Sequence, residues 1–207
     1  MHKHTTGPVE LPSDARTIAL AGNPNTGKTT LFNALTGLAQ QIGNYPGVTV
    51  ERKSGSWSLP DQTVELLDLP GTYSLAARSP DEMIAVDMLL GGHTGDPEAD
   101  AAVVIVDASN LRRNLYLLSQ LLEVQVPIVV ALNMVDIAET RGIHVDAGAL
   151  SSQLGVPVIP LCASRRQGLE PLTAAVAEAV RQPRRDAETP VDFPPPVAEL
   201  VARLAST

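Results

Sequence analysis

Cysteine is almost absent from this sequence, since Cys162 is the single one in 207 residues. A lone cysteine cannot form an intrachain disulfide. The N-terminus also lacks the combination of basic region, apolar stretch and small-residue cleavage site that marks a secretory signal. These two absences favour a reducing cytosol, and we expect the segment to be soluble and cytosolic.

Long apolar runs and an excess of positive charge are missing as well. The longest runs, residues 101–106 and 126–132, fall far short of the roughly 20 residues that a membrane-spanning helix needs, so we expect no membrane crossing here. Lys and Arg total 15 against 23 for Asp and Glu, which gives a net charge of −8. This charge offers no general attraction to nucleic acid or anionic lipid, so a local site must hold any phosphate.

The chain has the length of one α/β domain with a short appendage. Residues 1–15 are polar and contain Gly and Pro without an apolar period, which predicts a flexible leader. Residues 16–182 alternate apolar runs with helical patterns, as repeated βαβ units do. Residues 183–207 begin as a Pro-rich, charged linker, and 197–204 could begin a helix of a following helical domain.

The apolar pattern of residues 16–182 predicts a mostly parallel central sheet with helices on both faces. Predicted strands are 17–21, 64–68, 102–107, 127–133 and 158–161. Predicted helices are 28–35, 81–90, 111–123, 146–154 and 169–181. Residues 38–50 are expected to form a loop.

A phosphate-binding motif follows the first predicted strand. Gly22-Asn-Pro-Asn-Thr-Gly27-Lys28-Thr29 fits G-x-x-x-x-G-K-[ST] and precedes a predicted helix, where backbone N–H groups can face a β-phosphate. Lys28 would contact the β/γ-phosphates, and the Thr29 hydroxyl would bind Mg²⁺. The alternative, a glycine-containing turn with an exposed lysine, is disfavoured by the full motif in this context. The predicted nucleotide contacts are Gly22, Asn23, Pro24, Asn25, Thr26, Gly27, Lys28, Thr29 and Thr30.

A second anchor is predicted at Asp68-Leu-Pro-Gly71, although such a tetrapeptide alone could be a simple turn. Asp68 would hold Mg²⁺ through water, and the Gly71 N–H would bond the γ-phosphate and sense its presence. The loop 38–50 lies where a mobile switch belongs. Thr49 is the candidate that closes on Mg²⁺ and γ-phosphate, although its position alone does not single it out.

A base site is predicted from Asn133-Met-Val-Asp136, which ends a strand at the ligand-binding edge of an α/β sheet. Asp136 can accept from guanine N1–H and the exocyclic amine, donors that adenine does not offer. The segment Cys162-Ala163-Ser164 follows the last strand and can present backbone N–H groups, chiefly that of Ala163, to guanine O6. The predicted contacts here are Asn133, Met134, Asp136, Cys162, Ala163 and Ser164. Cys162 itself is expected to be a small packing residue at the strand end. A catalytic thiol would need a partnered base, and no motif connects a histidine to Cys162.

In this order the motifs are typical of a TRAFAC-class P-loop NTPase with a Ras-like G domain. The surrounding residues resemble the N-terminal cytosolic G domain of the ferrous iron transporter B (FeoB) family over about residues 16–182. Five segments carry the resemblance: GNPNTGKTTLFN from Gly22, GNYPGVTVERKSG from Gly43, DLPGTYSL from Asp68, VDASNLRRNLYL from Val106 and ALNMVD from Ala131.

The resemblance implies further roles. Thr49 becomes the switch threonine, with Gly47 and Val48 as neighbouring nucleotide contacts, and Asn25 a K⁺ ligand beside the phosphates. Thr72 stands where Ras-like proteins carry a water-orienting glutamine, which it cannot replace, so K⁺ is a plausible substitute. The expected catalytic residues are thus Lys28, Thr49, Gly71 and Asn25, and the expected metal ligands are Thr29, Thr49 and Asp68 for Mg²⁺ and Asn25 for K⁺.

The function implied is a GTPase switch that gates ferrous iron uptake, using GTP/GDP, Mg²⁺ and K⁺. The implied partners are the helical and transmembrane domains of a FeoB-type transporter and small accessory Feo proteins, at the cytoplasmic side of the bacterial inner membrane. Iron itself is not expected to bind here. One alternative is a ribosome- or RNA-associated assembly GTPase of the Era or MnmE kind, which the net negative charge disfavours. Another is a nucleotide-dependent interaction module that hydrolyses almost nothing.

Overall fold

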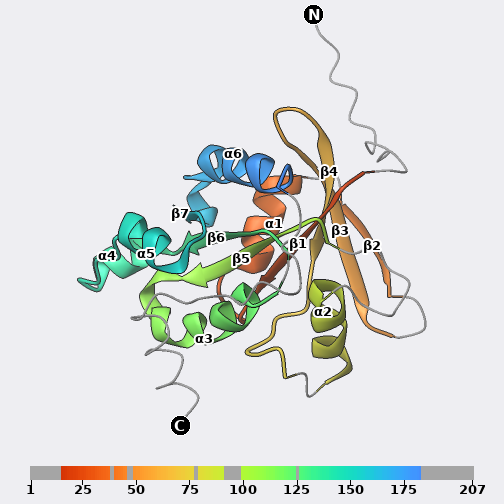
Figure 1. The fold of residues 1–207 in the computed structure, drawn as a ribbon, viewed down its shortest axis with the longest axis horizontal. Coiled ribbons are helices and arrows are strands. Elements are labelled where there is room, and N and C mark those ends of the chain that lie inside the picture. Colours follow the sequence, from red (N-terminus) through yellow and green to blue (C-terminus); the bar gives the residue numbers. More distant parts are fainter. Residues whose placement is uncertain are drawn as a thin grey trace, which may run out of the picture.

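A seven-stranded sheet in the order β2-β3-β4-β1-β5-β6-β7 forms the centre of the computed structural model (Figure 1). The structure describes residues 15–37, 40–45, 49–76, 79–90, 99–124 and 126–182. The predicted leader, except for its last residue, and the predicted linker 183–207 lie outside the described residues, as do Gly47 and Val48.

The five predicted strands are present and mutually parallel. They are β1 (Thr17–Gly22), β4 (Thr63–Asp68), β5 (Ala101–Asp107), β6 (Ile128–Asn133) and β7 (Val158–Pro160). All residues of β1 and β6 are buried, as expected for strands covered on both faces. The mostly parallel α/β fold is therefore confirmed.

Helices cover both faces of the sheet, and successive residues of each strand pack against opposite layers. Ile18 and Leu20 of β1 join the core beneath α1 (Lys28–Thr36) and α6 (Leu169–Ala179). Ala19 and Ala21 join the core on the other face. The helices that contribute to that second core are α2 (Pro80–Leu90), α3 (Leu111–Leu122), α4 (Val135–Thr140) and α5 (Ala147–Leu154). Figure 1 shows α1 and α6 on one side of the strands and α2 and α3 on the other.

Two features depart from the prediction. The segment expected as the loop 38–50 contains β2 (Gln40–Asn44), which pairs antiparallel with β3 (Glu51–Ser58), and β3 pairs antiparallel with β4. These strands are largely polar and partly exposed, and they have no apolar pattern that would reveal a strand in the sequence. They are defined by their pairing with neighbouring strands. The short helix α4 was also not predicted. Among the described helices, none has both the length and the apolar character needed to span a bilayer.

The carboxyl ends of the parallel strands bring the predicted motifs to one edge of the sheet. Gly22 ends β1, Asp68 ends β4 and Asn133 ends β6, while Cys162 follows β7 closely. Leu20 is paired with Asp68 across β1 and β4, which fixes the second anchor beside the first. This edge is where open α/β sheets bind ligands.

Candidate functional site

The turn between β1 and α1 needs glycine for both conformation and space. Gly27 lies in the left-handed region with a φ of 86°, and a Cβ placed on it would lie 2.4 Å from Asn133 Nδ2. The Thr26 hydroxyl donates to the Asn23 carbonyl at 2.8 Å and closes the turn. Glycine at position 27 therefore permits the backbone conformation of this turn, which lies at the carboxyl edge of the sheet.

A cavity of about 320 Å³ lies against this turn. It is lined by Asn23, Pro24, Asn25, Gly27, Lys28, Thr29, Thr30 and Gly71. All of these residues belong to the predicted phosphate site. Gly71 comes from a different segment, and a Cβ on it would lie 3.2 Å from Pro24 Cγ, so the two segments meet closely.

Lys28 and Asp68 form an ion pair beside this cavity. The Lys28 ammonium donates to Asp68 Oδ1, and the two side chains are 13% and 9% exposed. The pairing offsets the cost of holding each charge away from water. A phosphate chain and a divalent cation would each find an opposite charge here.

Thr72 turns its hydroxyl into the protein. It is 1% exposed, and its Oγ1 donates to the Ser74 carbonyl at 2.7 Å and accepts from the Ser74 N–H at 3.3 Å. Its own N–H donates to the Gly22 carbonyl at 3.3 Å. The hydroxyl therefore stabilises its own turn, in keeping with the inference that Thr72 does not replace a water-orienting glutamine.

Asn133 connects the phosphate turn to the loop after β7. Its Nδ2 donates to the Thr26 carbonyl at 2.9 Å, and its Oδ1 accepts from the Ala163 N–H at 3.0 Å. The residue is only 3% exposed. Both polar ends of Asn133 are therefore bonded within the protein, and they hold two separate loops at a fixed spacing.

The Ala163 N–H has an acceptor within the protein. The Ala163 N–H was expected to face guanine O6, but its single hydrogen is directed to Asn133 Oδ1. Ser164 follows in the same short turn, η2 (Ala163–Arg165), and is exposed. Cys162 is 3% exposed and packs at the strand end, with its Sγ 3.3 Å from Ser164 Oγ.

Asp136 has a neighbour that the sequence did not indicate. Its Oδ2 lies 3.3 Å from Arg165 Nη2, and the Asp136 and Arg165 side chains are 24% and 63% exposed. Nothing in the local pattern pairs a residue at the start of α4 with one in η2. The two arginines directly after the Cys-Ala-Ser segment, Arg165 and Arg166, were the available signal. Met134, between Asn133 and Asp136, has its Cε 3.5 Å from the Cβ position of Gly27 and so borders the phosphate turn.

Thr49 is not among the residues that line the cavity. It is exposed and lies between β2 and β3, where the Tyr45 N–H donates to the Val50 carbonyl at 3.0 Å. Among the described residues, no contact of Thr49 with Thr29 or Asp68 is recorded, whereas Asp68 is paired with Lys28.

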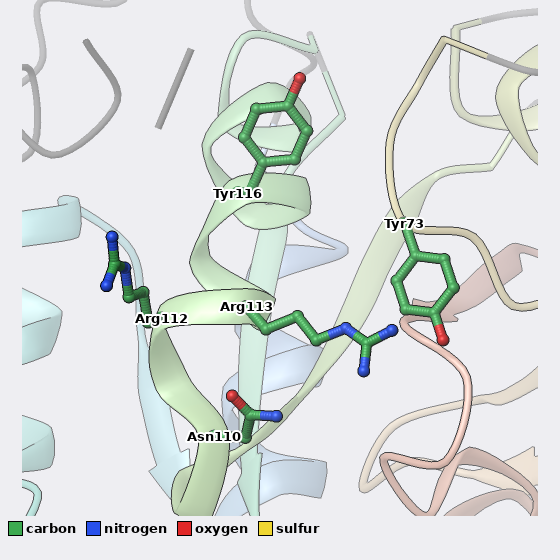
Figure 2. Close-up of a pocket in the computed structure, with 5 residues that line it drawn as sticks. All are labelled: Tyr73, Asn110, Arg112, Arg113 and Tyr116. Atoms are coloured by element: carbon green, nitrogen blue, oxygen red, sulfur yellow. The ribbon is translucent and has the colours of Figure 1, made fainter. Parts of the chain in front are cut away.

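A second hollow, of about 470 Å³, lies beside the segment that follows Gly71. Arg113 extends from the start of α3 toward Tyr73 (Figure 2), with its guanidinium carbon 4.3 Å from the ring centroid. This is cation–π geometry. Further along α3, Gln120 Oε1 accepts from the Leu75 N–H at 2.8 Å. Helix α3 thus contacts the segment after Gly71 at two points, Tyr73 and Leu75.

A family model described as "Ferrous iron transport protein B" matches residues 16–176. The chain belongs to this family. The Fe(2+) transporters FeoB of Shigella flexneri and of Escherichia coli K12 are each 55% identical to it over 164 residues, which are 77% of this chain and 21% of each transporter. The chain therefore spans about a fifth of the length of these FeoB relatives.

Solved FeoB structures match the fold as well. The cytosolic domain of L. pneumophila FeoB is 48% identical, with a TM-score of 0.73 over 79% of this chain and 68% of that one. The cytosolic domain of T. maritima FeoB in a GDP form is 41% identical, with a TM-score of 0.77 over 84% and 66%. The T. maritima FeoB G domain alone is 42% identical, with a TM-score of 0.73 over 81% of this chain and 99% of that one. The G-domain fold expected from the motifs is thus confirmed.

Proposed function

We propose that this chain binds GTP and hydrolyses it to GDP and phosphate, as the regulatory G domain of a ferrous iron transporter. The observation that carries the proposal is the link made by Asn133, which joins the phosphate turn to the loop beside Asp136. One ligand that spans both loops must carry phosphates at one end and a hydrogen-bonding base at the other. The FeoB proteins of T. maritima solved in GDP and GMPPNP forms support a guanine nucleotide.

The phosphate end is assigned to the cavity beside Gly27. Lys28 provides a positive charge for the β- and γ-phosphates, while the turn and the first amides of α1 donate N–H groups to them. The Gly71 N–H is close enough to the turn to bond a γ-phosphate. Loss of that bond after hydrolysis would release the segment that α3 holds through Arg113 and Gln120.

The metal requirements follow from the donor atoms present. The Thr29 hydroxyl and the Asp68 carboxylate are hard oxygen donors that suit Mg²⁺, and Thr49 would join them when the β2–β3 connection closes. When bound, Mg²⁺ offsets charge on the phosphates. Asn25 lines the same cavity and is exposed, so its amide oxygen can hold K⁺ beside the phosphates.

The base end is assigned to Asp136 and the turn after β7. Asp136 accepts from guanine N1–H and the exocyclic amine, and the backbone N–H groups of Cys162-Ala163-Ser164, chiefly that of Ala163, face guanine O6. Asn133 acts as a positioning residue through the two loops it joins. Met134 contributes apolar surface next to the phosphate turn.

The chain's wider role follows from its relatives. We propose that it lies at the cytoplasmic side of the bacterial inner membrane, attached to the helical and transmembrane parts of a transporter, with small accessory proteins as further partners. The state of the switch segments would then control iron passage through the rest of that protein.

The base assignment is tested with the variant Asp136→Ala. We expect wild type to prefer guanine over adenine nucleotides by about 10⁴ or more, and the variant to lose most of that preference, because no carboxylate then meets the guanine donors. Isothermal titration with GDP and ADP measures both affinities. Lys28→Ala is the matched comparison, since it weakens both nucleotides and leaves their ratio unchanged. An unaltered ratio in Asp136→Ala would contradict the assignment.

A further inference from the structure

Arg165 forms an ion pair with Asp136, whose carboxylate is the guanine acceptor in the proposed base site. Arg165 Nη2 lies 3.3 Å from Asp136 Oδ2. Asp136 is only 24% exposed, so few positions give access to its carboxylate. Any base that binds there meets a carboxylate that already has a guanidinium group beside it.

The guanidinium group and the guanine edge are chemically alike. Guanine presents N1–H and its exocyclic amine side by side, and arginine presents a planar set of N–H donors that matches a carboxylate in the same way. The two donor sets compete for the same acceptor oxygens. We propose that Arg165 is an internal competitor for guanine, which weakens nucleotide binding and speeds GDP release.

The position of Arg165 suits this exchange. Its side chain is 63% exposed, and among the described residues Asp136 is its sole recorded ion-pair partner. A guanidinium this exposed can turn to solvent when a nucleotide arrives and return when it leaves. Exposed pairs contribute up to about 1 kcal/mol, so the competition is worth up to about fivefold in affinity.

The neighbouring Arg166 provides a control within the same turn. It lines a different hollow, shared with Thr36, Trp57 and Glu170, and no ion pair is recorded for it among the described residues. Its φ is 55°, a left-handed conformation that asparagine adopts readily. Arg166→Asn therefore removes an equal charge from the same turn without straining it.

The test is the rate of fluorescent GDP release measured by stopped flow. We expect Arg165→Ala to slow release by about two- to fivefold, while Arg166→Asn releases at the wild-type rate. Raising NaCl from about 0.1 M to about 1 M should narrow the difference between wild type and Arg165→Ala, because salt screens the pair. Arg165→Lys keeps the charge and should release GDP faster than Arg165→Ala.

Two results would overturn the inference. Equal release from wild type and Arg165→Ala would mean that the pair has no effect, and faster release from the variant would mean that Arg165 supports bound nucleotide. The inference rests on the proposed base site, which Asp136→Ala tests separately through guanine preference. If that preference survives in Asp136→Ala, the base site itself is wrong. If it is lost while Arg165→Ala is silent, only the competitor role fails.

Discussion

Thr72 and Asn25 are the two residues on which the proposed role of K⁺ rests. The Thr72 hydroxyl is bonded to Ser74 and buried, so it does not reach a water molecule near the phosphates. Asn25 is exposed in a left-handed turn position and lines the cavity. At the scale of single residues, a bound cation near Asn25 is therefore a better candidate than a side chain for this role.

We expect GTP hydrolysis to be about tenfold or more faster in KCl than in NaCl, because a bound K⁺ would take the place of an arginine finger. Asn25→Ala should remove most of this difference, while Thr72→Ser, which keeps the hydroxyl, should not. Phosphate release under single turnover, with Mg²⁺ constant, measures both effects. Equal wild-type rates in the two salts would count against K⁺ activation.

Asn133 shows how single side chains join elements. It ends β6, reaches the turn between β1 and α1 through Thr26, and accepts from η2 through Ala163. Its neighbour in space, Gly27, has no room for a Cβ because the Asn133 amide occupies that position. The two halves of the site are thus fixed relative to each other by one buried amide.

Asn133→Ala should therefore affect both stability and binding. The change leaves a buried carbonyl and a buried N–H without partners, at about 1–3 kcal/mol for each group. We expect the free energy of unfolding to fall by about 2 kcal/mol or more, and GDP affinity to fall by about tenfold or more. Urea denaturation and GDP titration measure these effects. Asn110→Ala is the control, because Asn110 is exposed and its side chain does not cap α3. If Asn110→Ala lost as much stability and GDP affinity as Asn133→Ala, the positioning role of Asn133 would be contradicted.

At the scale of the whole molecule, this chain is about a fifth of a FeoB-length transporter. The proposed role requires that nucleotide binding in this fifth changes transport in the rest. Tyr73 and Leu75, which follow Gly71, contact Arg113 and Gln120 of α3. In the proposed role, these two contacts would transmit a change at Gly71 to α3.

We expect Lys28→Ala in the full-length transporter to abolish most Fe²⁺ uptake by cells, because the phosphate charge is then unpaired. Radioactive iron uptake measures the effect, and immunoblotting of membranes checks that the protein level is unchanged. Arg112→Ala removes an exposed charge outside the phosphate cavity and should transport normally. Normal uptake by a Lys28→Ala transporter that no longer binds GTP would contradict the regulatory role.

Much of the site could be predicted because its signals are local. The P-loop residues are contiguous, and the apolar runs predicted all five parallel strands. The antiparallel strands β2 and β3 could not be predicted, because their residues are largely polar and lack an apolar pattern, so that pairing with neighbouring strands defines them. The Arg165–Asp136 pair joins η2 to the first turn of α4, and no periodicity of the sequence connects these elements.

The sequence by itself determined the order of the motifs, the alternation of strands and helices, and therefore the family and the fold. Those features depend on side-chain type and spacing along the chain, which are fixed before folding. Only the tertiary structure decided which donor meets which acceptor: Ala163 bonds Asn133, Arg165 meets Asp136, and Thr72 bonds its own turn. Each of these depends on the direction of a single hydrogen or side chain, and that direction is set by packing between segments distant in sequence.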